Sequence, residues 1–115
     1  MSNHKITFTY LSQEDLLNAG CFDIRMAMQV AENTMLDFEK QRILFPEKVV
    51  QIFDQSTQNR INCLPATLLD EEICGVKWVS CFPKNPQSHE VQNLSAIFVL
   101  SEIKKGFPIA VLEGT

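Results

Sequence analysis

Polar and apolar residues alternate at the start of the chain, and this pattern predicts a short strand over residues 5–10. Ser12 follows, with Asp15 three residues later, which is a variant of the capping box that begins many helices. Gly20 can adopt the left-handed backbone conformation that often ends a helix. We therefore expect a short first helix between Ser12 and Gly20.

A second, longer helix is predicted from Asp23 to about Arg42, because apolar residues recur there every three or four positions. The positions that share this face are Ile24, Met28, Ala31, Met35 and Phe38. Methionine-rich faces can bind varied partners, but methionine more often fills irregular gaps in a protein core. We expect these methionines to pack in the core.

The pattern changes from helical to extended at Pro46. Apolar segments bounded by turn residues then predict strands over residues 49–54, 61–69, 73–82, 94–100 and 107–112. The polar residues 84–93 predict a long loop, and such loops often carry binding residues. The expected fold is α+β, with two N-terminal helices packed on a mixed, largely antiparallel sheet of about five to six strands.

One lysine lies in the middle of the apolar strand that runs from Ile73 to Phe82. Because side chains alternate along a strand, Lys77 faces one side and Trp78 the other, and both sides are rich in apolar residues. An ammonium in such surroundings must reach water along its stem, lose its proton or find an anion. The nearest acids, residues 70–72, precede the strand, so a carboxylate from outside the chain is a candidate partner.

Composition and charge exclude several functional classes. The 115 residues suffice for one domain, and 45% are hydrophobic and 21% charged, as in globular proteins. No apolar run approaches the roughly 18 residues that span a bilayer, and the N-terminus lacks a secretory signal. We therefore expect a cytoplasmic protein without a membrane partner. The formal charge of -4 includes no basic cluster, which argues against nucleic acid.

The chain has four cysteines, Cys21, Cys63, Cys74 and Cys81. They form no Cys-x-x-Cys pair, and only His4 and His89 could join them as metal ligands, so we expect neither a metal site nor a redox dithiol. Free cysteine behaves as a small apolar residue, and we expect these four to lie reduced in the core. His89 is expected at the surface of a loop.

The last apolar strand ends directly at the end of the sequence, which we interpret as the end of a piece of a longer protein. Short motifs occur in a defined order: Tyr10–Ser12 with Asp15–Leu16, Leu64–Ala66, Gly75–Ser80, Phe82–Asn85, Ala96–Leu100, Gly106–Pro108 and Leu112–Thr115. Together they resemble the amino-terminal part of the ornithine cyclodeaminase and mu-crystallin family, over nearly the whole chain.

The resemblance implies that residues 1–115 form a single substrate-binding and dimerisation domain. The complete protein would be an NAD-dependent cyclodeaminase or dehydrogenase, an oxidoreductase or lyase of amino-acid metabolism that acts on amino acids or related imines. A Rossmann domain that binds NAD follows this part in the family. The chain has four glycines and no Gly-x-Gly-x-x-Gly motif, so we expect the NAD-binding domain to be absent and the chain alone to be inactive, without bound NAD.

An alternative is a non-enzymatic, mu-crystallin-like module that binds a ligand or dimerises. Either function is compatible with a homodimer through the sheet, because strands that are apolar on both faces need to be covered.

The resemblance also implies three binding residues, and it assigns neither a catalytic nor a metal-binding residue to this chain. Lys77 corresponds to the family's lysine that pairs with the substrate carboxylate, in agreement with its need for an anion. Lys48 stands where the family has an arginine and would bind the same carboxylate, without an arginine's bidentate geometry. Asn93 stands where many members have a threonine near the nicotinamide and would contact the cofactor.

Overall fold

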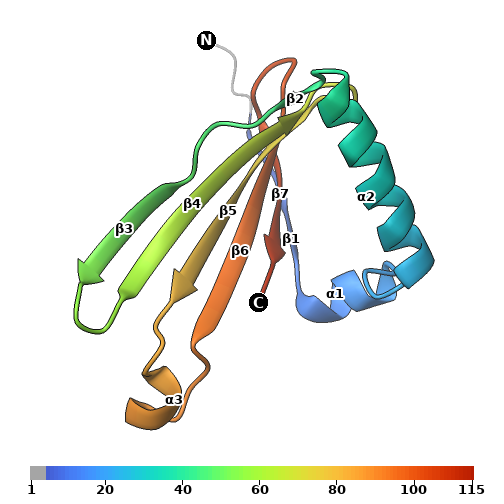
Figure 1. Ribbon diagram of the computed structural model, residues 1–115. Coiled ribbons are helices and arrows are strands. Elements are labelled where there is room, and N and C mark those ends of the chain that lie inside the picture. Colours follow the sequence, from blue (N-terminus) through green and yellow to red (C-terminus); the bar gives the residue numbers. More distant parts are fainter. Residues whose placement is uncertain (1–4) are drawn as a thin grey trace.

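The computed structural model describes residues 5–115, which form one open sheet with helices beside it (Figure 1). The helices are α1 (Gln13–Asn18), α2 (Ile24–Glu39) and α3 (Asn85–Ser88). The strands are β1 (Thr9–Leu11), β2 (Ile43–Leu44), β3 (Val49–Asp54), β4 (Asn59–Leu68), β5 (Ile73–Cys81), β6 (Leu94–Glu102) and β7 (Pro108–Glu113). The predicted α+β class is confirmed.

The sheet has seven strands in the order β1-β7-β6-β5-β4-β2, and β3 pairs with the same strand, β4, as β2 does. The long strands β4, β5 and β6 form its centre and are antiparallel. β1 is parallel to β7, so the sheet is mixed and largely antiparallel, as predicted. The strand missing from the prediction is β2, which has 2 residues and is too short to show an apolar pattern.

The two N-terminal helices begin where their capping residues predict. Ser12 Oγ accepts a hydrogen bond from the backbone N–H of Asp15 at 3.2 Å, and Asp15 Oδ2 accepts one from the backbone N–H of Ser12 at 2.9 Å. This is a complete capping box. At the start of α2, Asp23 Oδ1 accepts hydrogen bonds from two backbone N–H groups.

Two helix predictions differ from the structure. α2 ends at Glu39 rather than near Arg42, and Gln41 beyond it has a positive φ of 59°. The predicted loop over residues 84–93 contains the single helical turn α3, with Pro86 in its first turn. Proline suits that position, because its fixed φ is helical and its missing N–H has no partner there.

β2 and β3 form one interrupted edge strand beside β4, and the interruption lies opposite Pro65 of β4. A residue without a backbone N–H cannot donate a ladder hydrogen bond there. From the pair Ile43–Leu68 to the pair Val49–Cys63, the edge strand advances by 49 − 43 = 6 residues and β4 by 68 − 63 = 5. The edge strand therefore contains one extra residue, a β-bulge, opposite Pro65.

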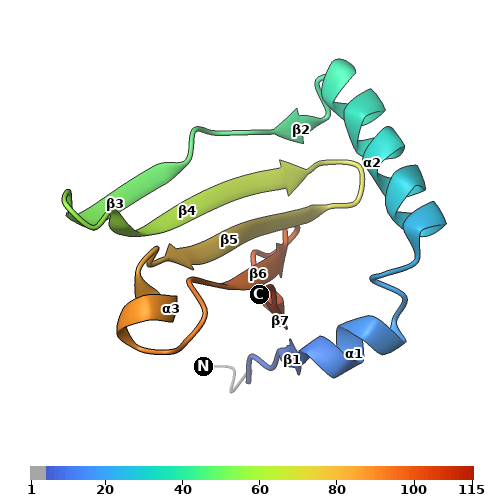
Figure 2. The ribbon, with the colours of Figure 1, turned by 60° about the horizontal axis from the view of Figure 1, so that its bottom comes forward.

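The described residues leave most of their apolar surface open. Ala96 is the only hydrophobic residue among them classed as buried, and Thr67 is the only polar one, with exposed fractions of 9% and 8%. α2 stands away from the sheet (Figures 1 and 2), and the Met35 side chain on it is 74% exposed. The radius of gyration, 16.8 Å, exceeds the roughly 13 Å of a compact domain of about this size. The expectation that the α2 methionines pack in a core is wrong within this chain.

The cysteines are all free, as predicted. Cys21 is exposed, so its assignment to the core is wrong, and the other three are only half-buried in the sheet. The reason is the same as for the methionines: residues 5–115 do not form a second layer that covers them.

Glu102 closes the β6–β7 hairpin by accepting hydrogen bonds from the backbone. Its carboxylate binds the N–H groups of Lys104 at 2.7 Å and Phe107 at 2.9 Å, and that of Lys105 with both oxygens. These hydrogen bonds, the one from Phe107 first, lower the pKa of Glu102 below its ordinary value.

We expect Glu102→Gln to lower the melting temperature at neutral pH, and the loss to shrink in acid. A lowered folded-state pKa means that the ionised carboxylate adds stability above the unfolded pKa, about 4.3, and that this stability disappears as the pH falls through the folded-state value. Thermal unfolding at a series of pH values measures the effect. Glu90→Gln, at an exposed loop position, is the control, and equal losses for both variants would contradict the assigned role.

Candidate functional site

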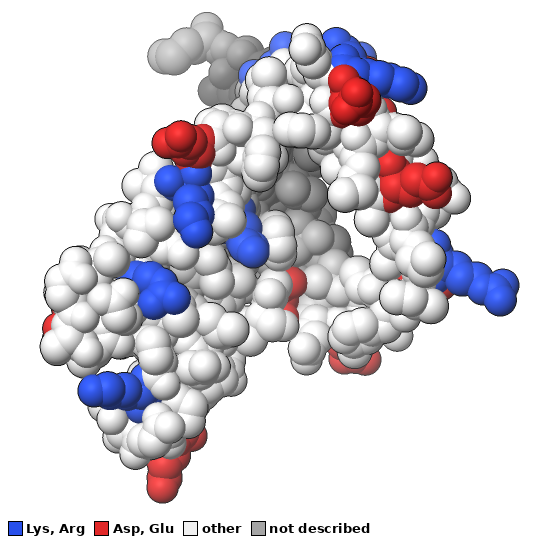
Figure 3. Space-filling model, viewed as in Figure 1, with Lys and Arg blue, Asp and Glu red and all other residues white. Residues whose placement is uncertain are grey.

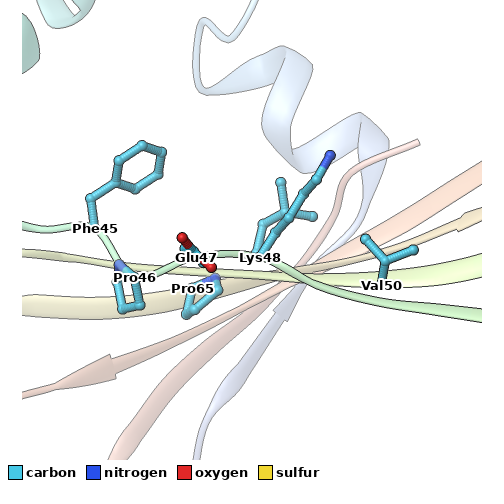
Figure 4. Close-up of a pocket in the computed structure, with 7 residues that line it drawn as sticks. Phe45, Pro46, Glu47, Lys48, Val50 and Pro65 are labelled. Carbon is cyan, nitrogen blue, oxygen red and sulfur yellow. The ribbon is translucent and has the colours of Figure 1, made fainter.

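The bulge opposite Pro65 places Lys48 on the same side of the sheet as Phe45 and Val50, and Figure 4 shows the three side chains pointing the same way. The β3–β4 register pairs Val49 with Cys63, so extending it by one residue sets Lys48 beside Leu64. Leu64 is paired on its other side with Lys77 of β5. Paired side chains share a face, so both lysines lie on one face with a single strand between them, their backbones about 10 Å apart. We call this surface the Lys77 face.

Three cavities lie on the Lys77 face. One, of about 470 Å³, lies against α2 and is lined by Thr34, Met35, Phe38, Ile43, Phe45, Ala66 and Leu68. Each of the other two includes a lysine. The first, of about 230 Å³, is lined by Leu64, Ala66, Leu68, Ile73, Gly75, Val76, Lys77, Phe98 and Leu100. The second, of about 600 Å³, is lined by Phe45, Pro46, Glu47, Lys48, Val50, Leu64 and Pro65. Leu64 lines both, so they are neighbours. In the space-filling view, a hollow lies between α2 and the sheet, with basic side chains on its sheet side (Figure 3).

Lys77 is half-buried in this setting, and Lys48 is exposed. The ion pairs found among residues 5–115 are Arg42 with Asp70 at 2.8 Å and Lys104 with Glu72 at 3.3 Å. Two of the acids that precede β5 therefore neutralise other cations. Lys77 has no carboxylate partner in the described part of the chain.

The sequence analysis missed Asn62, which also belongs to the Lys77 face. It pairs with Val50 and Val79, and it precedes Leu64 by two residues on β4. Its Oδ1 is buried without a hydrogen-bond partner, and no other side-chain oxygen or nitrogen of residues 5–115 is in this state. A lone amide between Ile61 and Cys63 in a strand was the signal that could have revealed it.

Asn93 lies apart from the two lysines. It precedes β6, and its backbone carbonyl accepts a hydrogen bond from the N–H of Phe82 at 2.8 Å. Phe98, the β6 partner of Lys77, is five residues further along, about 17 Å in an extended strand. The contact of Asn93 with a cofactor stays a prediction.

No group of three or more His, Cys, Asp or Glu side chains within residues 5–115 could hold a metal ion. His89 is exposed at the end of α3, as predicted, whereas His4 lies outside the described residues. Within the same range, no helix is long and apolar enough to cross a membrane.

The described residues do not fit a dinucleotide on their own. Such cofactors bind where a parallel strand turns into a crossover helix whose N-terminus faces the pyrophosphate. The one parallel pair of the described sheet joins β1 to β7, at opposite ends of the chain, and each of the other strand pairs is antiparallel.

Comparison with protein families matches residues 18–115 to the ornithine cyclodeaminase/mu-crystallin family. A comparison with curated proteins found no match. Among solved structures, an archaeal alanine dehydrogenase dimer with bound NAD is similar, with a TM-score of 0.79 and 26% identity over 92% of this chain and 31% of that chain.

Two further structures are similar. The Δ1-pyrroline-2-carboxylate reductase of Thermococcus litoralis, in complex with NADH and L-proline, has a TM-score of 0.81 and 25% identity over 92% of this chain and 32% of that chain. A probable ornithine cyclodeaminase from Bordetella pertussis has a TM-score of 0.73 and 15% identity over 93% of this chain and 30% of that chain, which supports the fold alone. This chain thus spans about a third of each structure.

We expect Asn62→Leu to raise the free energy of unfolding by about 1 kcal/mol, because it removes a buried acceptor that has no partner. Denaturant unfolding without any ligand measures this. Asn93→Leu, at an exposed position, is the matched control and should gain nothing. A stabilisation that is equal in both variants, or a loss at Asn62, would show that the Asn62 amide is satisfied in the protein.

Proposed function

Because the chain belongs to the ornithine cyclodeaminase/mu-crystallin family, we propose that it binds the carboxylate of an amino or imino acid for an NAD-dependent cyclodeaminase or dehydrogenase. The observation that carries the proposal is the pair of lysines on one face of the sheet. Lys48 and Lys77 line adjoining cavities, and neither forms an ion pair within residues 5–115.

The two lysines differ in their role. Lys77 is half-buried among apolar side chains, so a carboxylate there is shielded from water and the ion pair is stronger than at the surface. Lys48 is exposed, and its side chain is long enough to reach toward the same carboxylate across Leu64. Its main contribution is to attract and orient the anion, since exposed pairs add at most about 1 kcal/mol.

Asn62 would bind the amino or imino nitrogen of the substrate. The nitrogen of an amino or imino acid is attached to the carbon that carries the carboxylate, so a ligand held by Lys77 presents an N–H donor nearby. The Oδ1 of Asn62 on the same face has no partner, but it is buried and lines neither cavity, so the Asn62 side chain would have to rotate to accept from that donor. Two anchors on neighbouring atoms fix the orientation of the α-carbon, which is how a binding domain contributes to a reaction.

NAD would be held elsewhere in the complete protein. The similar alanine dehydrogenase and pyrroline carboxylate reductase were solved with NAD and NADH, and this chain spans about a third of each. We propose that further chain supplies the dinucleotide-binding half and that Asn93 faces it.

The face opposite Lys77 would form a homodimer. Trp78 and Ile97 are cross-strand neighbours on that face, and the Trp78 side chain is 42% exposed. An apolar sheet surface of this kind is normally covered by protein. The similar archaeal alanine dehydrogenase is described as a dimer.

We expect Lys77→Met in the complete protein to weaken amino-acid binding by about 10- to 100-fold, since it removes a charge-assisted contact and keeps the apolar stem. Lys48→Met should weaken it by about tenfold or less. Calorimetric titration with amino acids in the presence of NAD measures both.

Lys105→Met, in the exposed β6–β7 turn, is the control and should leave binding unchanged. Unaltered affinity in Lys77→Met would refute the proposal. Amino-acid binding that requires Lys77, but without NAD reduction by the complete protein, would instead identify a non-enzymatic binding protein.

We expect the protein to sediment as a dimer and Trp78→Glu to sediment as a monomer, because a carboxylate at the centre of an apolar interface is costly to bury. Trp78→Phe keeps an apolar ring and should remain dimeric. A monomer at high concentration for the unaltered protein would contradict the interface.

A further inference from the structure

Gly114 lies at a position where the backbone conformation does not require a glycine. It follows β7, and its N–H continues the ladder by donating a hydrogen bond to the backbone carbonyl of Ala96 at 2.9 Å. Among residues 5–115, the glycines with a positive φ are Gly20 and Gly106. A glycine in extended chain costs stability, so its missing side chain is expected to make room for another group.

The Phe98 ring fills the space that a side chain at position 114 would occupy. A Cβ built on Gly114 would lie 2.6 Å from Phe98 Cε2 and 2.8 Å from Phe98 Cδ2. Phe98 is paired with Leu112 of β7 on one side and with Lys77 of β5 on the other. Because Gly114 follows β7, this edge of the ring leans toward β7 and away from Lys77.

From this packing we infer that Gly114 is a positioning residue for Lys77. The inference rests on the proposed function and deepens it: Gly114 acts through Phe98 and keeps the ring clear of the ammonium that would bind the carboxylate. Non-bonded carbon atoms lie about 3.5–4.0 Å apart, so a methyl group at position 114 would displace the ring by about 1 Å. The space open to the ring is the cavity that Phe98 and Lys77 both line, so the ring would move toward Lys77.

Gly75 makes the same kind of room for Leu100, the other large β6 side chain that lines this cavity. A Cβ built on Gly75 would lie 2.8 Å from Leu100 Cδ2. Gly75 precedes Lys77 by two residues, so the two share a face of the sheet. Both β6 side chains beside Lys77 therefore lie over a glycine, and neither needs the space around the ammonium.

The experiment measures the binding of amino acids to the complete protein with NAD, by calorimetry over the twenty standard amino acids and L-ornithine. For the amino acid that binds the unaltered protein most tightly, we expect Gly114→Ala to weaken binding by about tenfold. Because the effect passes through Lys77, Gly114→Ala should cause no further loss in the Lys77→Met background. Additive losses, or an unchanged affinity in Gly114→Ala, would overturn the inference.

Gly106→Ala is the matched control. Gly106 has a φ of 78°, and a Cβ built on it would meet no atom within 4 Å, so alanine there strains the β6–β7 turn without filling any space. We expect Gly106→Ala to lower the melting temperature and to leave the affinity unchanged. Equal losses of affinity in Gly106→Ala and Gly114→Ala would show that instability alone weakens binding, against the inference.

A second substitution should rescue binding. Phe98→Leu removes the ring edge that a Cβ at position 114 would meet, so Gly114→Ala combined with Phe98→Leu should bind about as tightly as Phe98→Leu alone. An affinity that stays low in the double variant would show that Phe98 does not carry the effect. If Gly114→Ala alone failed to fold, the same comparison would still decide.

Failure of this inference differs from failure of the proposed function. Binding that requires Lys77 but is insensitive to Gly114→Ala would overturn the inference alone. Unaltered affinity in Lys77→Met, or an unaltered protein that binds none of these amino acids, would refute the proposed function and the inference with it.

Discussion

Pro65 cannot donate a hydrogen bond to the strand beside it, and the arrangement of the Lys77 face depends on that missing donor. The edge strand breaks into β2 and β3 there and takes in one extra residue. Without the extra residue, simple alternation would put Phe45 and Lys48 on opposite faces. With it, Lys48 comes to the face of Lys77, and the gap between the two short strands becomes a cavity.

A second constraint is that the sheet lacks cover. Within residues 5–115, neither face of the long strands β4, β5 and β6 is closed by a second layer, and the apolar side of α2 is open as well. The free energy that stabilises most domains of this size comes from burial that this chain does not achieve alone. The cavities of the Lys77 face are shallow for the same reason, and the other face offers Trp78 to a partner.

Local chemistry made much of the fold predictable from the sequence. The capping box at Ser12, the cap at Asp23 and the apolar strands after Pro46 each depend on residues close in sequence, and the structure confirms them. The strand predicted over residues 5–10 is shorter and later in the structure, at Thr9–Leu11. The strand β2 and the bulge were not predictable, because they depend on Pro65, about twenty residues further along the chain. The burial of Cys21 and of the α2 methionines was predicted wrongly. An apolar pattern predicts that a face is covered, but it does not identify the segment or the chain that covers it.

The candidate site was predictable in part. Lys77 stands out in sequence because a charge in an apolar strand requires explanation, and the structure leaves it without an internal partner. That Lys48 lies near Lys77 could not be predicted, because it depends on how β3, β4 and β5 are paired. Asn62 was missed, because an amide in a strand is common and only its burial without a partner sets it apart.

The parallel pairing of β1 with β7 also bears on how the chain folds during synthesis. Thr9 lies beside Ala110, so the first strand has no neighbour in the sheet until almost all of the described chain has left the ribosome. Contacts between residues so distant in sequence carry a large loop-closure entropy and slow folding. The hairpins of β4 to β7 can assemble earlier, and the N-terminal segment joins them last.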